Sequence, residues 1–339
     1  MPEAEVEQEL MLATAEEKTK TGDTAGALEI LQTAASQMAS APPSDLQSRV
    51  LRETGLAWRT LGDVEESSLA YTEALNVARA CGSREEEAFA LNGLAVAKHI
   101  EGDLELADQQ YAQAARLAAA AGLIRLTGMV EQNRGVIANI RGDLEKAQRR
   151  YRAALAAFEM TRDRQGVAWT LNNLGMLHAD MDEGEKALQA FRNALAAAQE
   201  ASDVELQARV RINWAGVLIH EGVHGEARTS LTEVLQVVGE GGFELLEAEA
   251  LTFLGKLERA CGDPSLALTH LSSAMEIGEA APDRLLVAEA ARESGACWMA
   301  LGDPVQARAA WQAAATNFDA LGADRDLADV KQRLVALGD

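Results

Sequence analysis

The chain has 339 residues, of which 48% are hydrophobic but only 4% aromatic, so its buried surface must come mainly from alanine and leucine. This composition suits closely packed helices and argues against a β-sheet or an aromatic-lined pocket. With 31 Lys and Arg against 53 Asp and Glu, the net charge is −22, which repels phosphate backbones and argues against nucleic acid as the main partner.

The cysteines and the apolar runs restrict the cellular setting. The three cysteines are odd in number and show no CxxC spacing, which predicts neither a disulfide framework nor a zinc site. The first ten residues, MPEAEVEQEL, contain no basic segment followed by an apolar one, and nowhere do 18 uncharged apolar residues run together. We therefore expect a cytoplasmic protein in a reducing compartment, with no membrane partner.

A Gly-Asp dipeptide recurs along the chain every 40 residues or a multiple of 40, and two related dipeptides fill the gaps. We call the first residue of each dipeptide the turn mark; in chain order the marks are Gly22, Gly62, Gly102, Gly142, Asp182, Gly222, Gly262 and Gly302. A constant period of this length predicts units that stack on their neighbours in a solenoid. Glycine accepts the left-handed conformation that ends one helix, and aspartate caps the next helix.

Residue size is also periodic around the turn marks. Five residues after each mark stands a small residue, and nine after it a large one, as in Tyr71, Tyr111 and Phe191. Seven residues before the mark the chain has glycine or alanine. Small residues at fixed positions predict close helix crossings, so each unit is expected to be a helix, a tight turn and an antiparallel second helix.

The expected fold is all-α, with eight helix-turn-helix repeats in one solenoid domain over residues 1–339. The repeats are predicted at 3–39, 45–80, 84–120, 123–160, 163–200, 203–239, 243–279 and 283–320. Within each repeat the first helix ends about two residues before the turn mark. A terminal helix at 324–337 carries one apolar stripe, Leu327, Val330, Leu334 and Leu337, and is expected to cap the open end.

These positions resemble the tetratricopeptide repeat, whose pattern runs Leu-Gly, Gly-Asp, a small residue, an aromatic and an alanine. The fullest match is LNNLGMLHADMDEGEKALQAFRNAL, Leu171 to Leu195. The common repeat has 34 residues, and a 40-residue version resembles Leu-Gly-Asn-repeat scaffolds, kinesin light chains and bacterial sensor regions. The resemblance implies a right-handed solenoid whose first helices line a concave face.

Asparagines form a ladder on that expected face. Asn133, Asn173 and Asn213 each stand nine residues before a turn mark, with Gln132 and Asn172 beside them. A carboxamide both donates and accepts hydrogen bonds, so such a ladder can hold the backbone of an extended peptide. The resemblance points the same way, because similar peptide-binding proteins use an asparagine ladder. The alternative is that these side chains bond to one another between adjacent helices.

The positions 13, 10, 9, 6, 3 and 2 residues before each turn mark are expected to face the concave groove. The charged and apolar residues at these positions suggest what the peptide carries. The basic ones include Arg49, Arg52, Arg59 and Arg209, which are available to carboxylates and predict an acidic or mixed-charge ligand. The alternative is that they are solvated helix residues. Apolar pockets are expected from Trp169, Met129, Met176, Ile212 and Phe89.

The sharpest catalytic string is His220-Glu221-Gly222-Val223-His224, which matches the HExxH motif of zinc proteases. That motif needs a continuous helix that stacks the two histidines one turn apart. Gly222 is a turn mark, so we expect the helix to break between them and the pair to be inert. The sequence contains no GxSxG, GxxxxGK[ST] or GxGxxG motif, and we expect neither enzymatic activity nor a cofactor or metal.

Three functions fit these observations. The favoured one is a non-catalytic adaptor that holds a protein or peptide segment in its groove. The second is a ligand- or peptide-sensing module of a bacterial signalling or transcription system, against which weighs the lack of an effector segment beside the repeats. The third is a self-associating scaffold.

Overall fold

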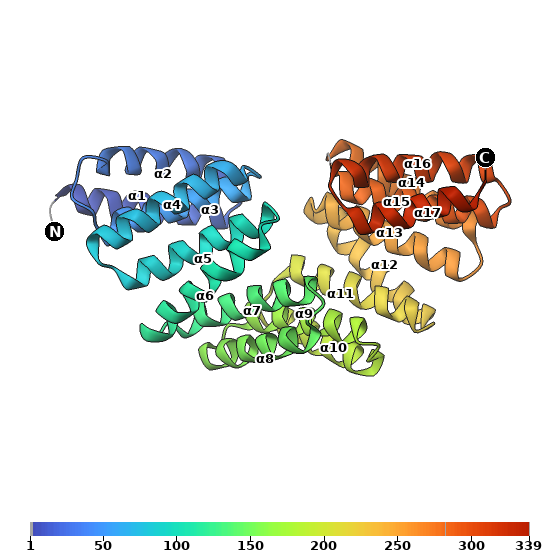
Figure 1. Ribbon diagram of the computed structural model, residues 1–339, viewed down its shortest axis with the longest axis horizontal. Coiled ribbons are helices and arrows are strands. Elements are labelled where there is room, and N and C mark those ends of the chain that lie inside the picture. Colours follow the sequence, from blue (N-terminus) through green and yellow to red (C-terminus); the bar gives the residue numbers. More distant parts are fainter. Residues whose placement is uncertain (1–2, 282, 339) are drawn as a thin grey trace. The chain divides into compact units, whose positions relative to one another are not determined.

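The computed structural model describes residues 3–281 and 283–338, and all seventeen elements in these ranges are α-helices (Figure 1). In chain order they are α1 (Glu3–Lys20), α2 (Thr24–Met38), α3 (Asp45–Thr60), α4 (Val64–Cys81), α5 (Arg84–Ile100), α6 (Leu104–Ala120), α7 (Ile124–Ile140), α8 (Leu144–Thr161), α9 (Arg164–Asp180), α10 (Gly184–Glu200), α11 (Val204–His220), α12 (His224–Gly241), α13 (Glu244–Ala260), α14 (Pro264–Ala280), α15 (Arg284–Ala300), α16 (Pro304–Ala320) and α17 (Asp324–Ala336). The predicted eight pairs and final helix are confirmed.

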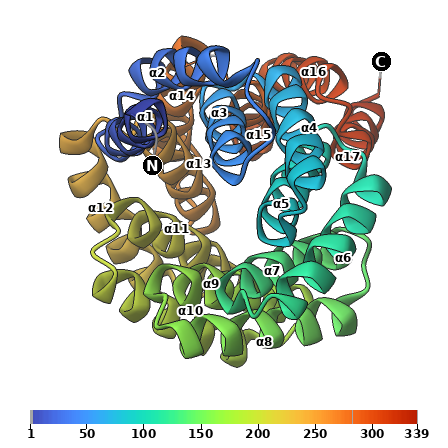
Figure 2. The same cartoon turned by 90° about the vertical axis from the view of Figure 1, so that its left-hand side faces the viewer.

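The chain divides into two compact units, Met1–Gly166 and Val167–Asp339. Unit 1 contains α1 to α8 and the first residues of α9, and unit 2 contains the rest of the chain. In unit 1 the first helices also contact one another, α1 with α3, α3 with α5 and α5 with α7 (Figure 2). In unit 2, α11 contacts α13 and α13 contacts α15. The single domain over 1–339 and the right-handed superhelix stay predictions.

The turn marks act as the sequence predicts. The six Gly-Asp glycines have φ between 76° and 88°, the left-handed region in which glycine has no steric penalty. In each of these dipeptides the aspartate side chain accepts a hydrogen bond from a backbone N–H of the following helix. The two irregular marks differ: Asp182 has a φ of 58°, and neither Glu183 nor Val223 makes a side-chain cap bond.

The small and large positions of one repeat pack against each other. A β-carbon added to Gly175 would lie 2.7 Å from the ring of Phe191, and one on Gly135 would lie 2.6 Å from the ring of Tyr151. The glycine seven residues before the mark therefore provides the space that the residue nine after the mark fills. This explains why both positions follow the same period.

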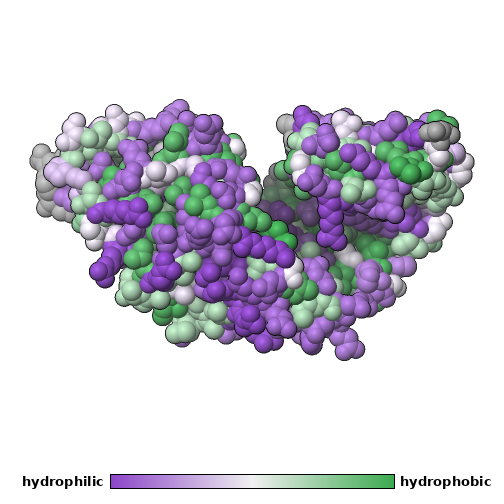
Figure 3. Space-filling view, in the orientation of Figure 1, coloured by the Kyte–Doolittle hydropathy of each residue, from purple (hydrophilic) through white to green (hydrophobic). Residues whose placement is uncertain are grey.

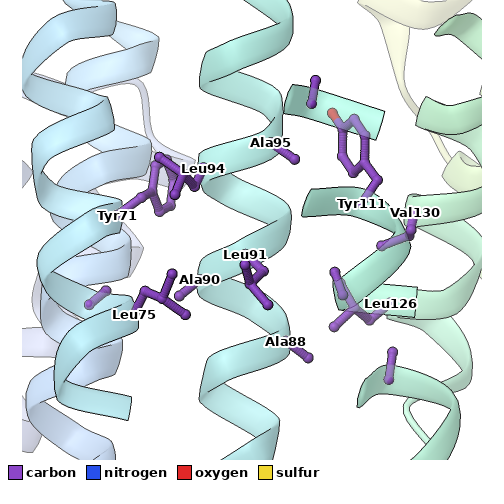
Figure 4. Close-up of a cluster of buried hydrophobic side chains, with 14 of the residues drawn as sticks. Tyr71, Leu75, Ala88, Ala90, Leu91, Leu94, Ala95, Tyr111, Leu126 and Val130 are labelled. Carbon is purple, nitrogen blue, oxygen red and sulfur yellow. The ribbon is translucent and has the colours of Figure 1, made fainter. Parts of the chain in front are cut away.

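Each unit has its own buried core between the helix pairs. In unit 1, Tyr71, Leu91, Tyr111, Leu126 and Val130 belong to one cluster that joins the second, third and fourth repeats (Figure 4). Burial of this apolar surface is what holds one repeat to the next.

The terminal helix covers the end of unit 2. Leu327 and Val330 of α17 are buried in a cluster with Trp311 and Phe318 of α16, and Leu334 and Leu337 pack against its edge. The predicted apolar stripe is therefore confirmed as the contact face of the cap.

Candidate functional site

We call the surface formed by the first helices of the repeats the first-helix face, and describe it separately in each unit. It is recognised by the residues 13 and nine before the turn marks. Phe89 and Met129 in unit 1 and Trp169 in unit 2 are partly exposed there, and Met176 is exposed. On the side of each unit that Figure 3 shows, hydrophilic residues predominate and small apolar groups lie between them.

In unit 1 one of the predicted arginines, Arg52, is held by close carboxylate partners. Arg52 lies 3.2 Å from Glu53 and 3.4 Å from Glu86, and its guanidinium sits over the ring of Phe89, 4.8 Å from the centroid. Burial raises the pKa of both carboxyls above their usual value, and Arg52 opposes this shift. The charge of Arg52 is thus largely matched within the unit.

The other two arginines of unit 1 are more available. Arg49 approaches Glu16 only to 3.8 Å, and both side chains are well exposed. Arg59 is half-buried and has no carboxylate within ion-pair distance among the described residues. Arg49 and Arg59 are therefore the cations that unit 1 offers to a ligand.

In unit 2 the first-helix face contains a pocket of about 300 Å³. It is lined by Arg209, Leu245, Leu246, Glu249, Asp283, Leu285, Leu286 and Glu289. Arg209 lies 3.7 Å from Glu249 and 3.6 Å from Glu205. Burial raises the pKa of Glu249, and Arg209 opposes the shift. With three carboxylates and one arginine, this pocket favours a cationic group. The sum of charges over all repeats hides this local excess of carboxylates.

The asparagines divide into two groups. The Nδ2 of Asn213 donates a hydrogen bond to Oδ1 of Asn172, 3.1 Å away, and Asn172 is only 3% exposed. Bonding between adjacent repeats, the alternative left open by the sequence, is therefore observed for this pair. Asn133 and Asn173 are half-buried, and among the described residues their carboxamides have no partner. Peptide binding by the ladder stays a prediction.

The residues ten before the turn marks were expected to face the groove, and for several of them this expectation is wrong. Ile212 is fully buried in the core of unit 2, and Asn92 and Thr252 at the same offset are 8% and 2% exposed. Their side chains point between neighbouring helices instead of to the surface. Gln132, also at this offset, is half-buried. The larger side chains of Arg52 and Arg292, at the same offset, are 22% and 17% exposed.

The HExxH string is interrupted as predicted. Helix α11 ends at His220, Gly222 has a φ of 74°, and α12 begins at His224. The two histidines therefore lie on different helices and cannot stack one turn apart. The described residues contain no group of three His, Cys, Asp or Glu side chains suited to a metal ion.

Comparison with known proteins agrees with this architecture. Residues 126–200 match the model of the tetratricopeptide repeat. This segment of the chain therefore consists of tetratricopeptide repeats. No curated protein matches its sequence.

Solved structures share the fold of this chain at low sequence identity. The apo form of the quorum sensor NprR from B. thuringiensis has a TM-score of 0.75 at 14% identity, over 92% of this chain and 87% of that one. A Rap protein complexed with Competence and Sporulation Factor has a TM-score of 0.64 at 13% identity, over 98% and 97%. Such identities show a common fold alone.

A third similar structure comes from a much longer chain. It belongs to the APC/C hetero-tetramer Cut9-Hcn1, with a TM-score of 0.61 at 18% identity over 80% of this chain. The match covers only 46% of that chain. In the part of our chain that the structure describes, none of the helices is both long enough and apolar enough to cross a membrane.

Proposed function

We propose that this tetratricopeptide-repeat protein is a non-catalytic adaptor that binds an extended, mixed-charge peptide segment on a first-helix face. The observation that carries the proposal is a stripe on α9 in unit 2. Trp169, Asn173 and Met176 stand 13, nine and six residues before the turn mark, so they share one side of the helix, and all are partly or fully exposed. An apolar contact, a free carboxamide and a second apolar contact are what a peptide backbone with apolar side chains requires.

Charge on the same face of unit 2 supports a ligand with a basic residue. The pocket of Arg209, Glu249, Asp283 and Glu289 lies on the helices that follow α9 along the chain. In unit 1, Arg49 and Arg59 favour an acidic residue. Each unit by itself thus favours one sign of charge in its ligand, an acidic residue in unit 1 and a basic residue in unit 2.

The test is a selection of peptides from a random display library, followed by calorimetric titration of the best binder. Removing one carboxamide should cost about 1 kcal/mol, so Asn173→Ala should weaken binding about fivefold. Trp169→Ala should weaken it more, because an aromatic anchor is lost. Asn193→Ala, on the exposed side of α10, is the control and should bind as the wild type does. Unchanged affinity in both first-helix variants would refute the proposal.

Peptide sensing is the second candidate, favoured by the fold shared with NprR and the Rap protein complexed with Competence and Sporulation Factor. Sensing requires that the peptide shift the protein between conformations. Small-angle scattering with and without a selected peptide separates the two: an adaptor keeps its radius of gyration and a sensor changes it. Light scattering at several protein concentrations tests the third hypothesis, self-association.

A further inference from the structure

A second pocket in unit 2 lies where α10, α11 and α12 meet, and it shares no lining residue with the pocket of Arg209 and Glu249. Its volume is about 420 Å³, within the range of small-molecule sites. It is lined by Arg192, Leu195, Arg211, Trp214, Leu218, Gly225, Glu226, Thr229, Ser230 and Glu233. Leu218 is fully buried and Ser230 is 8% exposed, so the floor belongs to the core of the unit.

The sixth repeat places unusual side chains at two positions that line this pocket. Eleven residues before the turn mark, four other repeats have a leucine, in Leu51, Leu91, Leu171 and Leu251, where this repeat has Arg211. Eight before the mark, Leu94, Leu174 and Leu254 are buried, where this repeat has Trp214. Arg211 extends to Glu233, with its Nε 3.1 Å from the carboxylate, and both side chains line the pocket.

The fourth repeat makes a similar departure but satisfies it internally. Glu131 and Arg134 replace the two apolar residues there. Arg150 lies 2.7 Å from Glu131, and Arg134 lies 2.8 Å from Asp108. The charged residues of the fourth repeat are therefore matched by ion pairs within unit 1.

Unmatched polar groups remain around the second pocket. The guanidinium of Arg192 stands over the ring of Trp214, 6.0 Å from the centroid, and among the described residues it has no carboxylate partner. The indole N–H of Trp214 is buried and has no hydrogen-bond acceptor among the described residues. By contrast, the indole N–H of Trp311 donates to the carbonyl oxygen of Arg292, 3.0 Å away. A buried N–H without an acceptor costs free energy. A ligand acceptor can remove this cost if the indole ring shifts and exposes its N–H.

We propose that this pocket binds a planar apolar ring that carries a carboxylate. The ring would take the place of the Arg192 guanidinium over Trp214, beside Leu195, and Arg192 would turn to pair with the carboxylate. Glu226 also lines the pocket and has no cationic partner among the described residues, so it opposes the anion. The same chemistry occurs in a free aromatic acid and in a peptide that ends in an aromatic residue.

Calorimetric titration with indole-3-acetate tests the proposal, and indole-3-acetamide, which has the same ring without the charge, is the matched ligand. The acid should bind at least tenfold more tightly than the amide. Arg192→Gln should abolish this preference, and Glu226→Gln should strengthen binding of the acid because it removes a neighbouring negative charge. Arg152→Gln is the control, since Arg152 occupies the equivalent exposed position on α8.

Trp214→Leu gives an independent check, because it restores the residue of the third, fifth and seventh repeats. It should keep the fold, by circular dichroism, and lose the acid. The tripeptide Gly-Gly-Trp and its C-terminal amide distinguish a peptide ligand from a small acid. If Gly-Gly-Trp with a free carboxylate is the only one of the probes that binds, the ligand is a chain end. If indole-3-acetate is the only one that binds, the ligand is a small aromatic acid. If neither acid binds, or if binding survives both Arg192→Gln and Trp214→Leu, the proposal is wrong.

Discussion

Asn213 donates a hydrogen bond to Asn172 across 3.1 Å, and so links α11 to α9 through two side chains 41 positions apart in the chain. Asn172 is 3% exposed, so water does not replace the bond when it is lost. This relationship separates the asparagines of unit 2 into a structural pair and the free Asn173.

The first prediction follows from that separation. Asn172→Ala leaves the carboxamide of Asn213 without its acceptor and should cost about 1–3 kcal/mol of stability. Asn173→Ala removes a side chain with no partner among the described residues and should change stability by less than about 0.5 kcal/mol. Thermal unfolding by circular dichroism measures both. Equal losses in the two variants would show that Asn173 is structural as well.

The close contact between Gly93 and Tyr71 gives the second prediction. A β-carbon on Gly93 would lie 2.1 Å from the ring of Tyr71, which is 3% exposed and held in the core. Gly93→Ala should therefore destabilise the protein by about 1–3 kcal/mol through overpacking. Gly239→Ala is the control, because nothing lies within 4 Å of its added carbon and alanine favours the helix by about 0.5–1 kcal/mol. The prediction fails if urea unfolding shows the two changes to be equivalent.

Asp182 is a turn mark without glycine, and this gives the third prediction. Its φ of 58° is left-handed, which costs a residue with a β-carbon about 1 kcal/mol. Asp182→Gly should recover part of that cost and raise the melting temperature. The reverse exchange, Gly142→Asp, should lower the melting temperature by a similar amount. A stabilising effect of Gly142→Asp would contradict the steric explanation.

The buried carboxyl of Glu249 gives the fourth prediction, on pH. Because burial raises its pKa in the folded state, the folded protein holds this proton more tightly than the unfolded chain does. The stability that Glu249 contributes therefore falls as pH rises from about 4.5 through the raised pKa. The free energy of unfolding of Glu249→Gln, minus that of the wild type, should increase over this window.

Glu183 provides a control of opposite sign. Hydrogen bonds from Lys186 and His178 lower the pKa of its carboxyl. The wild type therefore gains stability from Glu183 above the usual carboxyl range and loses it as pH falls through the lowered pKa. The corresponding difference for Glu183→Gln should decrease as pH rises. Urea titrations at low salt, from pH 3 to pH 7, measure both variants, and parallel profiles would contradict the assignment.

The fifth prediction concerns His220 and His224. Since they lie on two helices separated by the turn at Gly222, the double change to alanine should leave the melting temperature near that of the wild type. Elemental analysis of the purified protein should find no zinc in proportion to the chain. Stoichiometric zinc that disappears in the double variant would overturn this reading.

The sequence by itself determined the helices and the way each pair closes. Gly22 and Asp23 define a turn through φ and a side-chain cap, both local properties, so the helix boundaries followed from the marks to within about two residues. The contact between Gly175 and Phe191 was also readable, because both positions recur with the period and a small residue opposite a large one is a packing signal.

The tertiary structure alone decided which side chains of the candidate site are free. Arg209 meets Glu249 from the next repeat, and Asn213 meets Asn172 from the previous one, and such pairs depend on the side-chain rotamers and the exact stacking of neighbouring helices. The second pocket likewise depends on contacts between helices, because Arg211 of α11 pairs with Glu233 of α12 at its wall. A periodic pattern specifies where a residue stands on its helix, whereas its partner is chosen by distances across repeats that the pattern does not contain.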